Sequence, residues 1–275
     1  MYVGFEIENY KTTNPLSGLG VSRYIQGARS RIDDLALFII GSYNQRIVLD
    51  AEALSKKIFP EADYDVFLSH SHADQRHAVD LALALGEHGL KVFVDSTVWG
   101  LFGDLVNKII AQTRPSDGES KDDHIHRIHA DVHMMLAGAL HRTIARAEMF
   151  VFVRSEKSVP LVFNNEARTF SPWLYSELQF SFQVQHVIPK RILERREGAT
   201  LDSVKGVNSF GLESRQHVTA FKVFNEHLPE VGGETLRDWL VKQPTSTQGD
   251  AMLDALYSRF DLPGKYQRKR ELLKM

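Results

Sequence analysis

The stretch DYDVFLSHSHAD, residues Asp63–Asp74, decides the fold class of this chain. Its first half, Tyr64 to Leu68, is a short and mostly apolar run, typical of a strand that is buried on both faces. Its second half is polar and leads into Asp74–Gly89, where apolar residues recur with helical spacing up to a glycine stop. A buried strand, a polar loop and a helix in this order predict the first unit of a parallel α/β sheet.

The same alternation of apolar runs and helices continues along the chain. Apolar runs at Lys91–Val94 and Met149–Val153 are typical of further strands, and Gln185–Ile188 is a weaker one. A long helix is expected from about Asp131 to Ala147, and another helix begins at Ser171. We therefore predict a central parallel sheet that is covered by helices on both faces.

The two ends of the chain carry different patterns. Near the start, Tyr2–Ile7 is expected to be a short strand, and Ser22–Ile40 and Asp50–Ile58 are expected to be helices that end before a boundary at Pro60. After about Lys190 the chain is charged and mostly helical. The expected parts are an N-terminal extension, an α/β domain with a polar insertion, and a mostly helical C-terminal extension, at 1–60, 61–195 (insertion about 112–132) and 196–275.

Composition excludes several kinds of protein. The 275 residues are 43% hydrophobic and 25% charged, which is enough apolar material for a packed core. The net charge of −2 gives no argument for nucleic acid, and the basic end at residues 265–275 is typical of a solvated helix end. The absence of cysteine excludes disulfides and thiolate catalysis. The longest apolar run, Leu35–Gly41, is too short to span a membrane, so we expect a soluble cytoplasmic protein.

A second stretch, SPWLYSELQF (Ser171–Phe180), places a carboxylate near a helix start. Ser171 suits the N-cap, and Pro172 suits the first helical position, which has no N–H to satisfy. Trp173 and Glu177 are four residues apart and therefore share one face of the helix. This spacing indicates a defined place for the Glu177 carboxylate beside an indole ring.

Topology predicts where this carboxylate would meet other polar side chains. In an open parallel sheet, ligands bind at the C-terminal ends of the strands where the strand order reverses. The polar loops after Leu68 and Val94 lie at this edge, and so does the loop after Val153, which leads into the helix at Ser171. The residues expected to converge there are Ser69, His70, Ser71, Asp95, Trp99, Trp173 and Glu177.

Three segments together resemble the signature boxes of Toll/interleukin-1 receptor (TIR) domains. They are Asp63–Asp74, GLKVFVDS at Gly89–Ser96, and RAEMFVFVRS followed by SPWLYSEL within Arg146–Leu178. The resemblance covers about Asp63 to Lys190 and implies a flavodoxin-like sheet. Some TIR domains cleave NAD, so it also implies an NAD glycohydrolase or ADP-ribosyl cyclase with Glu177 as the catalytic carboxylate. NAD would be the substrate, and no cofactor would be required.

The chemistry of NAD cleavage fits one carboxylate. Breaking the nicotinamide–ribose bond builds positive charge on the ribose, which a preplaced carboxylate stabilises or captures as a glycosyl bond. Nicotinamide leaves as a neutral molecule, so no general acid is needed. Trp173 or Trp99 would face the cationic ring. The group Ser69–Ser71 would hydrogen-bond ribose or phosphate oxygens, and Asp95 would hold a ribose hydroxyl.

The resemblance extends to bacterial NAD-cleaving TIR proteins of Thoeris-type antiphage defence. Water attack on the intermediate gives ADP-ribose, and internal attack gives a cyclic isomer that serves as a signal. The resemblance implies self-association and either an activating partner or a downstream effector.

Other functions remain open from the residues alone. The chain also fits a non-catalytic TIR adaptor that recruits another protein, or a nucleotide N-glycosidase or deoxyribosyltransferase of the same fold. Without the surrounding motif, Glu177 fits a solvated residue near a helix N-terminus. Asp95 fits a cap for the next turn as well as it fits a binding residue.

The polar insertion contains a group of histidines that raises a separate question. On a helix, His126, His129 and His133 would share one face at a spacing that suits a transition metal, with His124 nearby. The alternative is a solvated insertion, and we expect no metal there.

Overall fold

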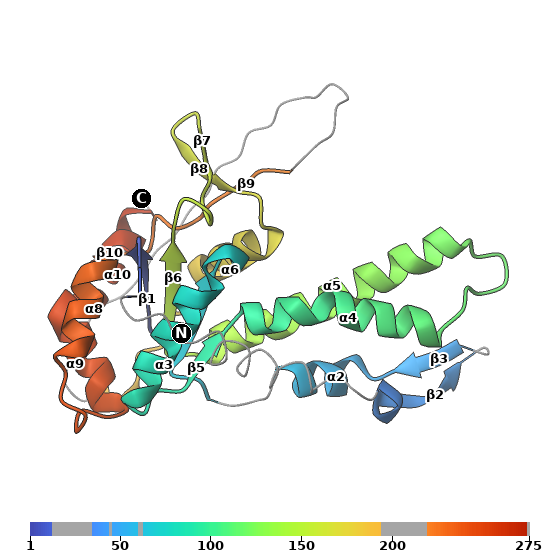
Figure 1. Ribbon diagram of the computed structural model, residues 1–275, viewed down its shortest axis with the longest axis horizontal. Helices are drawn as coiled ribbons and strands as arrows, with labels where there is room; N and C mark the ends of the chain where they lie inside the picture. Colours follow the sequence, from blue (N-terminus) through green and yellow to red (C-terminus); the bar gives the residue numbers. More distant parts are fainter. Residues whose placement is uncertain (13–34, 44–45, 60–62, 194–218, 274–275) are drawn as a thin grey trace. The chain divides into compact units, whose positions relative to one another are not determined.

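The computed structural model describes residues 1–12, 35–43, 46–59, 63–193 and 219–273, without the side chains at 35, 36, 46 and 97–101. A central parallel β-sheet is flanked by helices, which confirms the predicted α/β, flavodoxin-like fold class (Figure 1). In the described part of the chain, no helix is long and apolar enough to cross a membrane.

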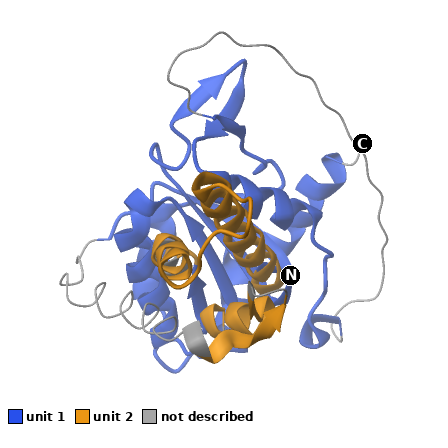
Figure 2. Cartoon of the chain, turned by 90° about the vertical axis from the view of Figure 1, so that its right-hand side faces the viewer, with its two compact units in different colours: residues 1–15, 64–94, 144–275 blue, residues 16–63, 95–143 orange. Residues whose placement is uncertain are grey.

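The described chain forms two compact units (Figure 2). Unit 1 holds the central sheet and is built from Met1–Pro15, Tyr64–Val94 and Ile144–Met275. Unit 2 is built from Leu16–Asp63 and Asp95–Thr143. These bounds differ from the expected division at residues 60 and 195, because the first strand and the C-terminal helices both belong to unit 1.

The described part of the central sheet has five strands, all parallel, in the order β10–β1–β6–β4–β5. Their bounds are β1 Val3–Glu8, β4 Val66–His70, β5 Val92–Val94, β6 Met149–Arg154 and β10 Glu230–Gly232. The strands predicted near the chain start, after Asp63, after Gly89 and after Ala147 are therefore confirmed. Each is apolar because helices cover both faces of the sheet.

The strand order contains one reversal, and it lies between β4 and β6. From β4 the chain continues through α3 (Gln75–Glu87) to β5 on one side, whereas from β6 it continues through α6 (Pro172–Gln183) toward β10 on the other. Right-handed crossovers in opposite directions put their helices on opposite faces of the sheet. The loops that follow β4 and β6 therefore diverge, and this edge is the switch point where such sheets bind ligands.

Strand β1 changes the expected picture of the N-terminal residues. It lies between β6 and β10, in register from Val3 opposite Met149 to Glu8 opposite Arg154. In a flavodoxin-like order of 2-1-3-4-5, the fourth place belongs to the strand that follows the third. The corresponding order in this sheet is β5–β4–β6–β1–β10. The fourth place is therefore taken by β1, a strand from the start of the chain. Residues Val3–Glu8 are thus a strand of the central sheet.

Aromatic rings form the core on the α6 face of this sheet. Phe93, Phe67 and Phe150 lie side by side on β5, β4 and β6, with ring centroids 5.3 and 5.6 Å apart. Gly4 continues this row on β1, because it is the register partner of Phe150. A Cβ at Gly4 would lie 2.8 Å from the side chain of Leu228, so the missing side chain leaves room for the C-terminal part of the chain.

The remaining elements of unit 1 form a second small sheet and a C-terminal helical group. The small antiparallel sheet joins β7 (Leu161–Phe163), β8 (Glu166–Thr169) and β9 (Phe221–Lys222). Asn164 and Asn165 form the β7–β8 turn with positive φ values of 51° and 60°, which suit a hairpin. The helices are α7 Lys190–Leu193, α8 Gly233–Val241, α9 Asp250–Phe260 and α10 Leu262–Leu272. The weak run at 185–188 is not a strand.

Unit 2 pairs a hairpin with helices. Its elements are the 3₁₀ helix η2 Leu35–Phe38, strands β2 Ile39–Tyr43 and β3 Arg46–Leu49, and helices α2 Ala51–Ile58, α4 Ser96–Gln112 and most of α5 Lys121–Arg146. The helix predicted over 50–58 is confirmed. The one predicted over 22–40 is wrong at its end, where the β-branched residues Ile39 and Ile40 belong to a strand that pairs with β3. Its residues 22–34 lie outside the described residues.

The expected polar insertion at about 112–132 is mostly helix. Helix α5 begins at Lys121, well before the predicted start at Asp131. Ser120 explains the early start, because its Oγ accepts a hydrogen bond from the Asp123 N–H at 3.0 Å, as an N-cap does. Acidic residues in the first turn, Asp122 and Asp123, add favourable charge at the helix N-terminus.

Candidate functional site

The candidate site lies in unit 1, at the C-terminal ends of β4 and β6. Strand β4 ends at His70 and β6 at Arg154, and helix α6 begins at Pro172 after the β7–β8 hairpin. The predicted start of α6 is confirmed: the Ser171 Oγ accepts from the Leu174 N–H at 3.2 Å, and Pro172 fills the first turn. The sequence therefore sets the register that carries Glu177 toward the sheet.

Glu177 and Ser69 are joined directly. The Ser69 Oγ donates a hydrogen bond to Glu177 Oε2 at 2.5 Å, across 108 residues of sequence. Both side chains have an exposed fraction of 0%. A hydrogen bond to a buried carboxylate is stronger than one between neutral groups, and its loss leaves an expensive buried charge. Two residues that the sequence assigned to one site thus meet, and Glu177 is not the solvated helix residue of the alternative interpretation.

A second carboxylate ties the two diverging loops together. Asp74, at the start of α3, accepts at its Oδ2 from Ser71 after β4 and from Ser155 after β6, the latter at 2.5 Å. Asp74 is buried, with 5% of its surface exposed. This Ser–Asp–Ser link bridges the switch point. Asp74 and Ser155 were not among the predicted site residues, although they are the last residues of the stretches DYDVFLSHSHAD and RAEMFVFVRS that carried the resemblance.

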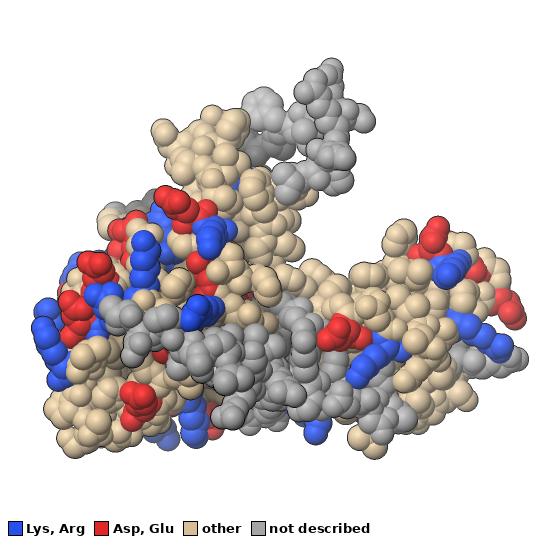
Figure 3. Space-filling model, viewed as in Figure 1, with Lys and Arg blue, Asp and Glu red and all other residues tan. Residues whose placement is uncertain are grey.

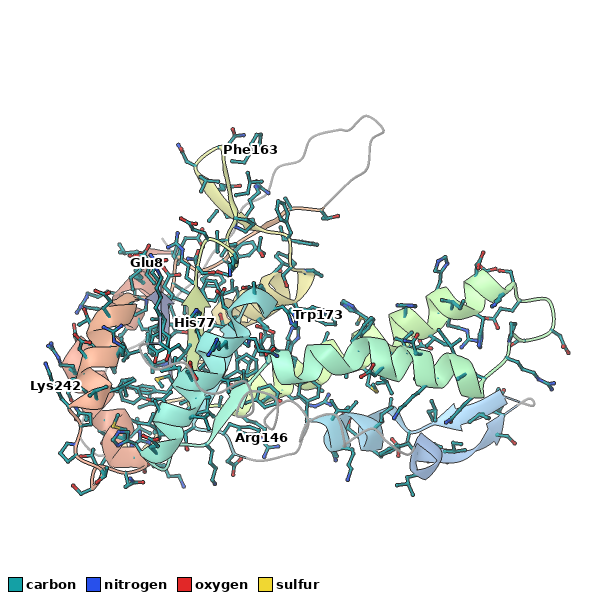
Figure 4. All side chains as sticks on the ribbon, in the orientation of Figure 1. Glu8, His77, Arg146, Phe163, Trp173 and Lys242 are labelled. Carbon is teal, nitrogen blue, oxygen red and sulfur yellow. The ribbon has the colours of Figure 1, made fainter. Side chains whose placement is uncertain are left out.

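Two other predicted residues of unit 1 occupy less central positions. His70 is buried, and it points to the face opposite Ser69 because successive strand residues alternate. Trp173 is partly exposed in the first turn of α6 (Figure 4), whereas Glu177, one turn later, is fully buried. The indole and the carboxylate therefore have different surroundings despite their spacing of four.

Asp95 and Trp99 belong to unit 2. Asp95 is buried at the N-cap position of α4, where its Oδ1 accepts from the Ser96 N–H at 2.6 Å. Trp99 lies in α4, and its side chain is outside the described residues. The structure describes neither residue relative to Glu177, and their convergence on one edge stays a prediction.

Sequence reasoning missed a polar pair on β1 and β6. Glu6 is 1% exposed; its Oε1 accepts from Arg154 Nη1 at 3.2 Å, and its Oε2 accepts from Asn225 Nδ2 at 2.6 Å. Burial raises the pKa of Glu6 above its ordinary value, against the opposing effects of the Asn225 hydrogen bond and the Arg154 charge. The signal in the sequence was a glutamate placed within the apolar run of the first strand.

The histidines of the insertion belong to α5 in unit 2 and differ in burial, since His126 and His129 are exposed. His124 is buried, with Nε2 3.1 Å from Thr113 Oγ1 and Nδ1 3.0 Å from Arg127 Nη2. His129 and His133 both lie against the ring of Phe102, with centroids 5.7 and 6.3 Å away. Across the described ranges, no group of three or more histidine and acidic side chains is arranged to hold a metal ion.

Comparisons with family models, curated proteins and solved structures found no match. The class of protein is therefore defined by its own geometry: a flavodoxin-like α/β protein whose parallel sheet reverses its order between β4 and β6. Its candidate site combines the buried Ser69–Glu177 pair with the link through Asp74, both at the C-terminal edge of those two strands.

Proposed function

We propose that this protein is a TIR-like enzyme that cleaves the nicotinamide–ribose bond of NAD, with Glu177 as the catalytic carboxylate. The observation that carries the proposal is the hydrogen bond of 2.5 Å between Ser69 and Glu177 at the switch point. It joins the end of β4 to helix α6 of the third sequence segment. A ligand bound at this edge would lie beside this buried pair and would reach it once the segments that cover it open.

The chemistry assigns each part a role. The Glu177 carboxylate stabilises the positive charge that develops on the ribose, or forms a transient glycosyl bond with it. Ser69 fixes one oxygen of this carboxylate, and Trp173 offers an aromatic face to the cationic nicotinamide ring. Since Glu177 is fully buried, the surrounding segments must open before NAD reaches it. The same proposal has the protein act in the cytoplasm as an assembly that signals to an effector, through ADP-ribose or a cyclic isomer.

The test is chromatography of NAD after incubation with concentrated protein. Wild type is expected to release nicotinamide, and Glu177→Gln, which keeps the shape of the side chain, to release none. Glu156→Gln is the matched control, because Glu156 is an exposed glutamate in the turn after β6. The second product distinguishes hydrolysis from cyclisation. Equal activity of wild type and Glu177→Gln, or no nicotinamide release by an assembled wild-type protein, would overturn the proposal.

A binding module is the second candidate, and the complete burial of Glu177 favours it. The β7–β8 hairpin beside α6 exposes Val162 (68%) and Phe163 (58%), side chains suited to contact with another protein. Figure 3 shows mostly uncharged atoms around this hairpin, whereas acidic and basic groups mix over the helices on the left. A protein with this function would keep its biological activity in Glu177→Gln. A nucleotide N-glycosidase would instead release a base from nucleotides and leave NAD intact.

A further inference from the structure

Arg154 occupies a position at the switch point that the proposed chemistry does not yet use. It is the last residue of β6, and its side chain is 30% exposed. Among the described residues, it makes one side-chain hydrogen bond, from Nη1 to the buried Glu6 at 3.2 Å. A guanidinium has five N–H donors, so most of its donor capacity remains for a ligand that approaches from solvent.

The register of the sheet relates Arg154 to Glu177. Ser69 is the register partner of Phe152, and Arg154 follows Phe152 by two residues, so Ser69 and Arg154 point to the same face. Strand geometry puts their Cα atoms about 8 Å apart, from about 4.8 Å between strands and about 6.6 Å along β6. Glu177 contacts Ser69 on this face. Arg154 therefore lies close enough for the 5′-phosphate of a ribose at Glu177 to reach it.

The surroundings of Arg154 hold it in this place. Glu6 anchors one guanidinium nitrogen from within the protein, and Asn225 anchors Glu6 in turn at 2.6 Å. An arginine that is fixed on one side by a buried carboxylate presents its remaining donors in a defined plane, which suits bidentate binding of phosphate. Glu8 lies opposite Arg154 on β1, is exposed, and forms no ion pair with it in the described structure. Its negative charge opposes an anion at this position.

We propose that Arg154 binds the pyrophosphate of a nucleoside diphosphate ligand, with Glu6 holding the guanidinium in position. The proposal rests on the proposed function for the identity of the ligand, because NAD and ADP-ribose carry this group. It adds an anion-binding residue on β6 to a site whose other groups come from β4 and α6.

Calorimetric titration of the full chain with ADP-ribose tests this binding without any turnover. Arg154→Gln is expected to weaken binding by roughly 10- to 100-fold, as the loss of a charge-assisted phosphate contact does. Lys157→Gln is the matched control, because Lys157 is exposed a few residues further along the chain, and it is expected to leave the affinity nearly unchanged. Glu8→Gln is expected to tighten binding by a few fold. Circular dichroism of each variant checks that the fold is kept.

The outcomes separate this inference from the proposed function. Affinity for ADP-ribose, compared between wild type, Arg154→Gln and Lys157→Gln, tests the inference, whereas nicotinamide release, compared between wild type and Glu177→Gln, tests the enzyme. Binding that depends on Arg154 in a protein that never cleaves NAD would support the inference and overturn the enzyme. Equal weakening by Arg154→Gln and Lys157→Gln, equal affinity of Arg154→Gln and wild type, or no binding by wild type would overturn the inference. Titration with adenosine and with inorganic pyrophosphate shows which part of the ligand is bound.

Discussion

The buried histidine His227 makes the acid stability of unit 1 predictable. Its exposed fraction is 0%, its Nε2 lies 3.0 Å from Ser181 Oγ on α6, and the centroid of the Tyr266 ring is 6.0 Å from its own. Burial, together with the nearby charges of Arg270 and Lys269, lowers the pKa of His227 from 6.5 to about 3. The folded protein therefore keeps this ring neutral where the unfolded chain protonates it.

The sign and size of the effect follow from this difference. Between pH 6.5 and about 3 the unfolded state binds more protons at His227, so the free energy of unfolding falls as the pH falls. One pKa unit corresponds to about 1.4 kcal/mol, so this histidine alone removes about 2 kcal/mol of stability between about pH 7.5 and about pH 5. That is a large part of the total for an ordinary domain.

Urea unfolding at several pH values, followed by circular dichroism, measures this loss. His227→Gln keeps a donor near Ser181 but cannot be protonated, so its unfolding free energy should depend on pH less steeply than that of wild type, by about 2 kcal/mol over the same range. His72→Gln removes an exposed histidine of the same unit and should leave the wild-type dependence unchanged. Parallel curves for wild type and His227→Gln would refute the reasoning.

Three further predictions concern unit 1 and use the same urea assay. In a double-mutant cycle, Ser69→Ala and Glu177→Gln should show a coupling energy of about 1.5–3 kcal/mol, and additive effects would contradict their hydrogen bond. Phe67→Leu should lower the free energy of unfolding by about 1–3 kcal/mol, since it removes two ring contacts at 5.3 and 5.6 Å; an unchanged value would speak against the aromatic row. Gly233→Ala should cost about 1–3 kcal/mol, because its Cβ would lie 2.5 Å from backbone after β1. Gly86→Ala should instead raise the free energy of unfolding by about 0.5–1 kcal/mol, because a Cβ at this helix position would meet no atom within 4 Å apart from its chain neighbours and the backbone of its own helix. Equal effects of the two substitutions would contradict the close approach at Gly233.

The sequence predicted those features that depend on local pattern. The apolar runs of β4, β5 and β6 need burial on both faces wherever they lie in the sheet, and the cap at Ser171 needs only its own helix. The contact between Ser69 and Glu177 followed from these elements together with the rule that parallel strands end at one edge. This part of the site was therefore accessible without a structure.

The remaining features depend mainly on pairings between distant parts of the chain. The sequence of Val3–Glu8 does not indicate that its neighbours in the sheet are β6 and β10. For this reason β1 was expected in an N-terminal extension, and the contact between Glu6 and Arg154 was not predicted. The start of α5 was missed for a different reason, because the cap at Ser120 is a local signal that the polar composition around it obscured. A single capping serine is a weaker signal than a long polar stretch, although here it decides the structure.

The place of β1 in the sheet also has a consequence for how the chain folds. In the described structure, its partners in the sheet begin at Met149 and Glu230. More than half of the chain must therefore be synthesised before β1 can pair with either neighbouring strand. Contacts of such long sequence separation close slowly, because loop entropy is lost before the ladder forms. During synthesis, the apolar strand Val3–Ile7 is an unpaired edge that invites aggregation. A fragment spanning 61–195 would lack β1 and leave one side of β6 open in the same way.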